Sequence, residues 1–86
     1  MFQRIHHVGI AVRDMDAALA LYGRAAGGRL IERGPSSDGA LELAMLALGD
    51  TLIEPIAPLR EGTEIGKFLD RRGEGLHHIA YEVGNV

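Results

Sequence analysis

The pattern of apolar and polar positions in the first part of the chain predicts a strand followed by a helix. Residues 5–12, IHHVGIAV, mix β-branched with small residues and end at a polar pair, which favours a strand. Asp14 then stands as a helix N-cap, and Gly27-Gly28 as the stop signal. Between them, the apolar residues have the spacing of one helical face: Met15, Ala18, Leu19, Tyr22, Ala25 and Ala26.

Turn-forming residues divide the middle of the chain into three further strands. The sequences GPSSDG and GD separate strands that we expect over residues 29–33, 40–48 and 51–56. The last two are expected to form a hairpin. Pro55 lies inside the final strand and cannot donate to a ladder, so we expect an edge, a bulge or the end of the strand there.

A helix over about residues 63–72 and a strand over residues 76–83 complete the pattern. The helix carries Ile65, Phe68 and Leu69 on its apolar side. Strands mixed with two helices predict an α+β fold, with a βαβββ order in the first part of the chain.

An internal repeat links the first and last strands. IHHVGIAV at residues 5–12 matches LHHIAYEV at residues 76–83, with an offset of 71 residues from His7 to His78. The same offset takes the helix cap at Asp14 to Asn85, which is also a good N-cap residue. We therefore expect a second copy of the module to start at the last strand, with its helix beginning near Asn85.

Composition excludes several classes of protein. The chain has 86 residues, 47% apolar and 24% charged, which is typical of a globular protein with a modest core. It has no cysteine, so neither a disulfide nor a thiolate metal site is available. A net charge of −3 with one adjacent basic pair, Arg71-Arg72, argues against nucleic acid, and no apolar run approaches a membrane span. We expect a soluble, cytoplasmic protein.

The four histidines lie in two His-His pairs, and strand alternation gives each pair one histidine per face. His7 shares its face with glycine and alanine, which leaves open space, whereas His6 shares its face with the apolar row that a helix would cover. The same test favours His78 over His77. We therefore take His7 and His78 as metal-ligand candidates and expect His6 and His77 to face the helical layer.

Glu54 is the third ligand candidate, because it shares a strand face with apolar residues, where a carboxylate is costly unless it is paired or binds a metal. The alternative is an exposed acid turned outward beside Pro55. Two imidazoles and a carboxylate suit Zn, Co, Ni, Mn or Fe. Glu82 shares the face of His78 but is about 13 Å away along the strand, so we expect it to be exposed or to line a rim.

Glu42 lies on the middle strand, with alanines on the same face, so it is able to point into an open concave surface. The residues alone favour a surface acid at this position.

Three segments carry a resemblance to a known family. IHHVGIAV followed by an acid and a helix, GDTLIEPIAPL, and EIGKFLDRRGEGLHHIAYEV together resemble the methylmalonyl-CoA epimerases of the vicinal oxygen chelate (glyoxalase, bleomycin-resistance and dioxygenase) superfamily. In that superfamily two βαβββ modules form a cupped sheet around a divalent metal. The resemblance implies His7, Glu54 and His78 as ligands, and Glu42 as a catalytic acid.

The same resemblance implies one incomplete domain over residues 1–86. Its first βαβββ module covers residues 4–58, a connecting segment with a short helix covers 59–75, and the start of a second, otherwise missing module covers 76–86. The fourth metal ligand and the second proton-transfer group of the family have no counterpart in the chain.

The implied activity is metal-dependent epimerisation of methylmalonyl-CoA, by proton transfer at the carbon next to the thioester. The alternatives are an enzyme like lactoylglutathione lyase, or a non-catalytic metal- or ligand-binding module. The expected partners are an acyl-CoA substrate and either a second copy of the chain or a complementary module.

Overall fold

The structure is a computed structural model that describes residues 1–84 of the chain. The predicted second helix cap, Asn85, lies outside the described residues. Among residues 1–84, no helix has the length and apolar character needed to cross a membrane.

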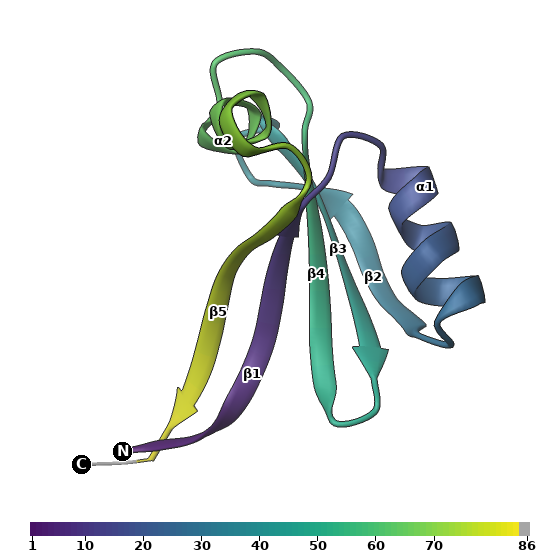
Figure 1. Ribbon diagram of the computed structural model, residues 1–86, viewed down its shortest axis with the longest axis vertical. Helices are drawn as coiled ribbons and strands as arrows, with labels where there is room; N and C mark the ends of the chain where they lie inside the picture. Colours follow the sequence, from purple (N-terminus) through teal and green to yellow (C-terminus); the bar gives the residue numbers. More distant parts are fainter. Residues whose placement is uncertain (85–86) are drawn as a thin grey trace.

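A mixed sheet of five strands is built outward from β1, Phe2–Ala11, and β4, Thr51–Pro58, which pair in parallel (Figure 1). β5, Gly75–Val83, pairs antiparallel with β1 at one edge. On the other side, β3, Leu41–Leu48, forms a hairpin with β4, and β2, Arg29–Pro35, pairs with β3. The strand order is therefore β2-β3-β4-β1-β5, and the α+β class and the βαβββ order followed by one further strand are confirmed.

The first helix, α1 (Met15–Leu19), packs on one face of the sheet. Asp14 caps it as predicted, with its carboxylate accepting a hydrogen bond of 3.1 Å from the backbone N–H of Ala17. The helix then continues as a π-helical segment, η1 (Ala20–Ala25), which the apolar spacing did not distinguish from an α-helix. Its side of the sheet holds a buried cluster of small and apolar residues: Val12, Met15, Ala18, Ala44 and Ala57.

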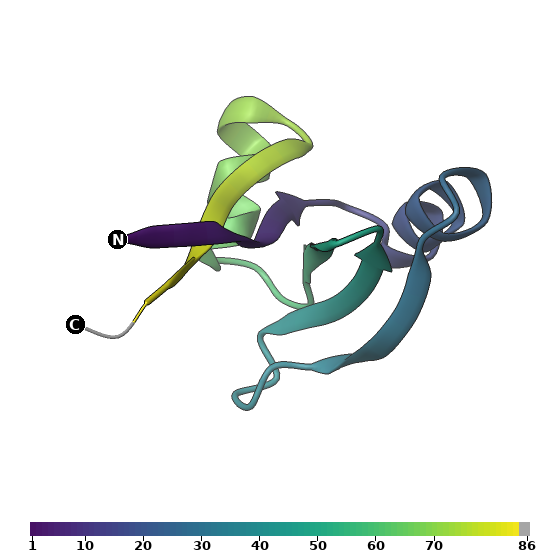
Figure 2. The same cartoon turned by 90° about the horizontal axis from the view of Figure 1, so that it is seen from below.

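The second helix, α2 (Glu64–Arg72), covers one end of the opposite face. Thr63 caps it by accepting a hydrogen bond of 3.0 Å from the N–H of Gly66. In the buried cluster beneath it, Ile65 and Leu69 of the helix pack on Ala11 of β1 and Ile56 of β4. These two strand residues alternate with those that face α1. Figure 2 shows the two helices well apart, and within residues 1–84 no further helix covers the rest of the α2 face.

Pro55 does not mark an edge, a bulge or a strand end, and that expectation is wrong. β4 runs on to Pro58 in the middle of the sheet, and the Pro55 side chain is fully buried. The pairs Leu43↔Ile56 and Leu46↔Ile53 keep one register, with no pairs between them. The missing donor therefore interrupts the ladder locally, and the paired positions on both sides hold the strand.

Candidate metal centre

Three neighbouring strands place the predicted ligands on the uncovered face of the sheet. Gly9 on β1 stands directly between Glu54 on β4 and His78 on β5 in the strand register. His7 lies two residues before Gly9, so its side chain points to the same face. The parallel β1–β4 pairing and the antiparallel β1–β5 pairing therefore bring the three side chains together from three strands.

The ligand atoms form a triangle of the size that a metal requires. The Nε2 atoms of His7 and His78 are 3.2 Å apart, and Oε1 of Glu54 lies 3.6 Å from the first and 3.8 Å from the second. A point equidistant from three atoms at these separations is about 2.1 Å from each of them, which matches metal–imidazole and metal–carboxylate bond lengths. The donor set and its spacing thus fit a divalent metal, and no other group of three or more potential ligands is found in residues 1–84.

Gly9 makes room for the His78 imidazole. A Cβ atom at this position would lie 2.5 Å from Nδ1 and 2.6 Å from Nε2 of His78, much closer than non-bonded atoms approach. The open space predicted beside His7 exists, therefore, and the ring of the second ligand fills it.

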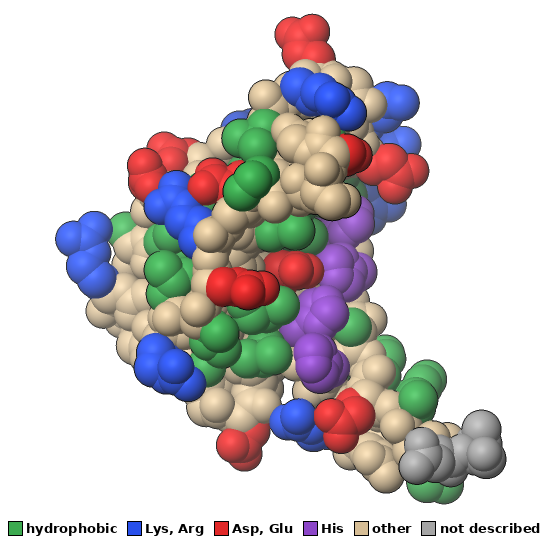
Figure 3. All heavy atoms as spheres, turned by 180° about the vertical axis from the view of Figure 1, so that it is seen from behind, with side chains coloured by type: hydrophobic (Ala, Val, Ile, Leu, Met, Phe, Trp, Pro, Cys, Tyr) green, Lys and Arg blue, Asp and Glu red, His purple; other side chains and the backbone are tan. Residues whose placement is uncertain are grey.

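The centre is accessible from solvent. The side chains of His7 and Glu54 are 20% and 18% exposed, and that of His78 is 36% exposed. Figure 3 shows the histidine side chains in one continuous row on this face, with acidic side chains beside them. A small molecule or water is therefore able to reach the centre and supply further oxygen ligands.

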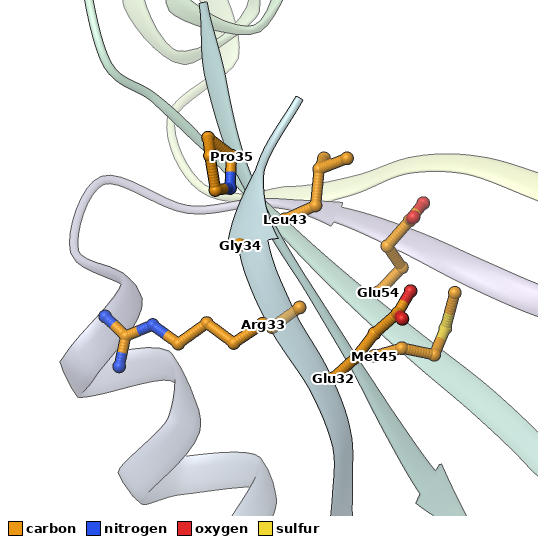
Figure 4. A pocket seen from close by; sticks show the side chains of 8 residues that line it. Glu32, Arg33, Gly34, Pro35, Leu43, Met45 and Glu54 are labelled. Carbon is orange, nitrogen blue, oxygen red and sulfur yellow. The ribbon is translucent and has the colours of Figure 1, made fainter. Parts of the chain in front are cut away.

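A cavity of about 210 Å³ adjoins Glu54 towards the β2 edge of the sheet. Leu43 and Met45 of β3 form its apolar wall, and Glu32 of β2 contributes a second carboxylate (Figure 4). Sequence reasoning did not consider Glu32, which follows a register shift between Leu30 and Glu32 that breaks the alternation of β2. No pattern in the sequence signals that shift.

Glu42 does not point into this surface, and the expected orientation is wrong. It pairs with Ala57, which belongs to the cluster under α1, and its carboxylate accepts a 2.7 Å hydrogen bond from Nε of Arg33. Arg33 also reaches Asp16 on α1 at 2.8 Å, and the two carboxylates raise the pKa of its guanidinium. In Figure 4, Arg33 extends towards α1 whereas Glu32 and Glu54 lie on the other side.

The expectation that the outer histidines, His6 and His77, face the helical layer holds only for His77, whose ring packs on Phe68 of α2. His6 is exposed. The Nδ1 atom of each is 2.9 Å from Nδ1 of the neighbouring ligand histidine, so neither lies with the row under α1. Glu82 stays out of the ligand group, as predicted: its side chain is 41% exposed and its carboxylate accepts a 3.2 Å hydrogen bond from Arg4.

The fold, together with the sheet face that carries His7, Glu54 and His78, indicates the superfamily of the protein. The chain belongs to the glyoxalase/bleomycin resistance protein/dioxygenase superfamily, whose family model matches residues 6–86.

Two epimerases are similar to the chain over nearly all of its length. The chain is 37% identical over 87 aligned residues to the ethylmalonyl-CoA/methylmalonyl-CoA epimerase of Cereibacter sphaeroides, covering 100% of this chain and 65% of that protein. It is 34% identical over 84 residues to the human mitochondrial methylmalonyl-CoA epimerase, covering 96% of this chain and 48% of the relative.

Solved structures of epimerases share this fold. The crystal structure of methylmalonyl-CoA epimerase from Mycobacterium tuberculosis matches with a TM-score of 0.87 and 36% identity, over 99% of this chain and 58% of that one. A methylmalonyl-CoA epimerase in complex with methylmalonyl-CoA and NH4+ matches with a TM-score of 0.86 and 32% identity, over 100% and 64%. The chain thus spans about half to two thirds of the length of these relatives.

Proposed function

We propose that this chain carries metal ligands of an enzyme that epimerises methylmalonyl-CoA. The triangle formed by His7, Glu54 and His78 carries this proposal, because a divalent metal fits it in a chain similar to several such epimerases. The complex of one related epimerase with methylmalonyl-CoA supports the choice of substrate.

In the proposed reaction the proton leaves the carbon between the thioester and the carboxylate of the substrate. The two imidazoles and Glu54 would hold the metal, which supplies Lewis-acid stabilisation of the negative charge on the substrate oxygens. The cavity beside Glu54 gives the substrate a place next to this centre, with apolar contacts from Leu43 and Met45.

We assign proton removal to Glu32. It is the other carboxylate that lines the cavity beside Glu54, and it is exposed, so a substrate can reach it. The family resemblance implied Glu42 instead, but that side chain is bound to Arg33 on the opposite face. Return of a proton from the other side of the substrate needs a second group, which we assign to a partner module or a second copy of the chain. The cytoplasm is the proposed location.

The test is exchange of the substrate α-proton in deuterated water, with the protein loaded with Co²⁺. We expect deuterium to enter methylmalonyl-CoA, and a chelator to stop its entry. A metal-loaded protein that exchanges no proton, but converts the hemithioacetal of glutathione, would contradict the proposal in favour of a lyase of the same superfamily.

A further inference from the structure

Two β-bulges between β1 and β5 fall on the two outer histidines. The register passes from Ile5↔Tyr81 to His7↔Ala80, which leaves His6 as an extra residue on β1. It later passes from Gly9↔His78 to Ile10↔Leu76, which leaves His77 as an extra residue on β5. Bulges re-aim side chains and are frequent beside active sites. Here each bulge lies next to a ligand candidate, once on each strand.

The bulges join the four imidazoles into one chain of contacts. Nδ1 of His6 lies 2.9 Å from Nδ1 of His7, and Nδ1 of His77 lies 2.9 Å from Nδ1 of His78. The Nε2 atoms of His7 and His78 meet in the middle at 3.2 Å. Neighbouring rings stand edge to face, at interplanar angles between 77° and 88°. Each inner histidine therefore has Nε2 towards the centre and Nδ1 towards an outer histidine.

This arrangement fixes where the protons must lie when a metal is bound. A neutral imidazole that binds a metal through Nε2 carries its proton on Nδ1 and donates it. The outer histidine must then accept at Nδ1 and carry its own proton on Nε2. Neutral imidazoles satisfy both contacts at once, in the manner of the outer hydrogen bonds that orient metal-bound histidines.

We propose that His6 and His77 are positioning residues of the metal centre, each holding a ligand imidazole in the tautomer and orientation that presents Nε2 to the metal. This inference rests on the proposed metal site, and it goes beyond it by assigning a role to the two histidines that are not ligands.

The side chains of the two outer histidines differ in how tightly the surrounding residues pack against them. His77 packs edge to face on Phe68 of α2, with ring centroids 5.2 Å apart, whereas His6 is exposed. A ring fixed by packing loses less conformational freedom when it accepts a hydrogen bond. His77 should therefore contribute more than His6 to metal affinity.

The test is titration of the whole chain with Co²⁺, in which the visible absorption of the bound Co²⁺ reports binding. His6→Phe and His77→Phe keep a ring and remove the acceptor, while His6→Asn and His77→Asn keep an acceptor oxygen near the Nδ1 position. We expect the phenylalanine variants to bind about 10- to 100-fold more weakly, with an altered spectrum, and the asparagine variants to recover most of the loss. The His77 variants should show the larger change.

Four outcomes are distinguishable. Wild-type and phenylalanine variants that bind Co²⁺ equally tightly, with the same spectrum, would overturn this inference and leave the metal site standing. A wild-type chain that binds no Co²⁺ would overturn both. If the phenylalanine variants do not fold, nitrogen NMR of the zinc-loaded wild type decides. Protons on Nε2 of His6 and His77, with Nδ1 of both unprotonated and accepting from His7 and His78, support the inference, and a proton on Nδ1 of either outer histidine overturns it for that histidine.

Discussion

At the scale of single residues, the centre depends on a position that carries no side chain. Gly9 is buried, and the imidazole of His78 occupies the space where its Cβ would be. We predict that Gly9→Ala displaces His78 and lowers metal affinity at least about 10-fold, while the unfolding free energy of the metal-free chain changes by no more than about 1 kcal/mol.

The matched control is Gly34→Ala on β2. A Cβ there meets no atom within 4 Å, and the backbone does not require glycine. Calorimetric titration with Zn²⁺ and denaturant unfolding of both variants make the comparison. Equal metal affinity in Gly9→Ala and the wild type would mean that His78 is not a ligand in this orientation.

Two acids on opposite faces of the sheet give the second prediction. Glu32 lines the cavity beside Glu54, and Glu42 is paired with Arg33 on the α1 side. In the Co²⁺-loaded protein, we expect Glu32→Gln to slow exchange of the methylmalonyl-CoA α-proton about 100-fold or more, since a general base typically contributes 10²–10⁴-fold. Glu42→Gln should leave the rate within a few-fold of the wild type, and the reverse order of effects would return the base to Glu42.

At the scale of elements, the turn between β2 and β3 is held by an acid. Ser36 Oγ donates to Asp38 at 2.7 Å, and the N–H of Ala40 donates to the same carboxylate at 3.0 Å. These hydrogen bonds, that of Ser36 first, lower the pKa of Asp38 below its ordinary value of 3.8. Because the folded-state pKa is depressed, the stabilisation is complete above the unfolded-state pKa and is lost as pH falls through the folded-state pKa.

We therefore predict that Asp38→Asn lowers the unfolding free energy at pH 7, and that the difference from the wild type narrows as pH falls below about 4. Urea unfolding at a series of pH values measures it. Ser36→Ala, which removes the larger cause of the shift, should show the same trend. A difference that stays constant from pH 7 to pH 3 would rule out the carboxylate as its origin.

The elements also show how far the sequence alone could lead. Apolar periodicity and turn residues located the strands and the two helical regions found in residues 1–84. Face alternation chose His7, Glu54 and His78, whose ligand atoms do converge. Alternation did not place His6 and His77 beside the ligand histidines, because the β1–β5 register shifts at both residues. A bulge depends on pairing between strands distant in sequence, so a single chain's pattern does not contain it. Glu42 was misplaced because the resemblance outweighed the simpler interpretation of a surface acid.

At the scale of the whole molecule, β5 leaves one edge of the sheet unpaired within residues 1–84. Large apolar side chains are exposed near it: Phe2 and Tyr81 stack on each other while 67% and 48% exposed, and Val83 is 58% exposed. Such an edge is a template for association. The chain also spans only 58% of the length of the M. tuberculosis epimerase that it matches.

We predict that the isolated chain self-associates at micromolar concentration, with two-fold symmetry as the commonest closed solution. Light scattering across a dilution series, with and without a chelator, measures this. Ile79→Lys and Tyr81→Lys place charges along the edge and should shift the equilibrium towards the monomer. A well-folded monomer for the wild type at micromolar concentration would contradict the prediction.

The claim on which the whole account depends is that His7, Glu54 and His78 bind one divalent metal, and anomalous diffraction from crystals soaked in Co²⁺ tests it most directly. We predict an anomalous peak about 2.1 Å from Nε2 of His7, Nε2 of His78 and Oε1 of Glu54, and its loss when both imidazoles are removed in His7→Ala/His78→Ala. A saturating soak that leaves no peak between these three side chains, or a peak that persists at this position in the double variant, would contradict the claim.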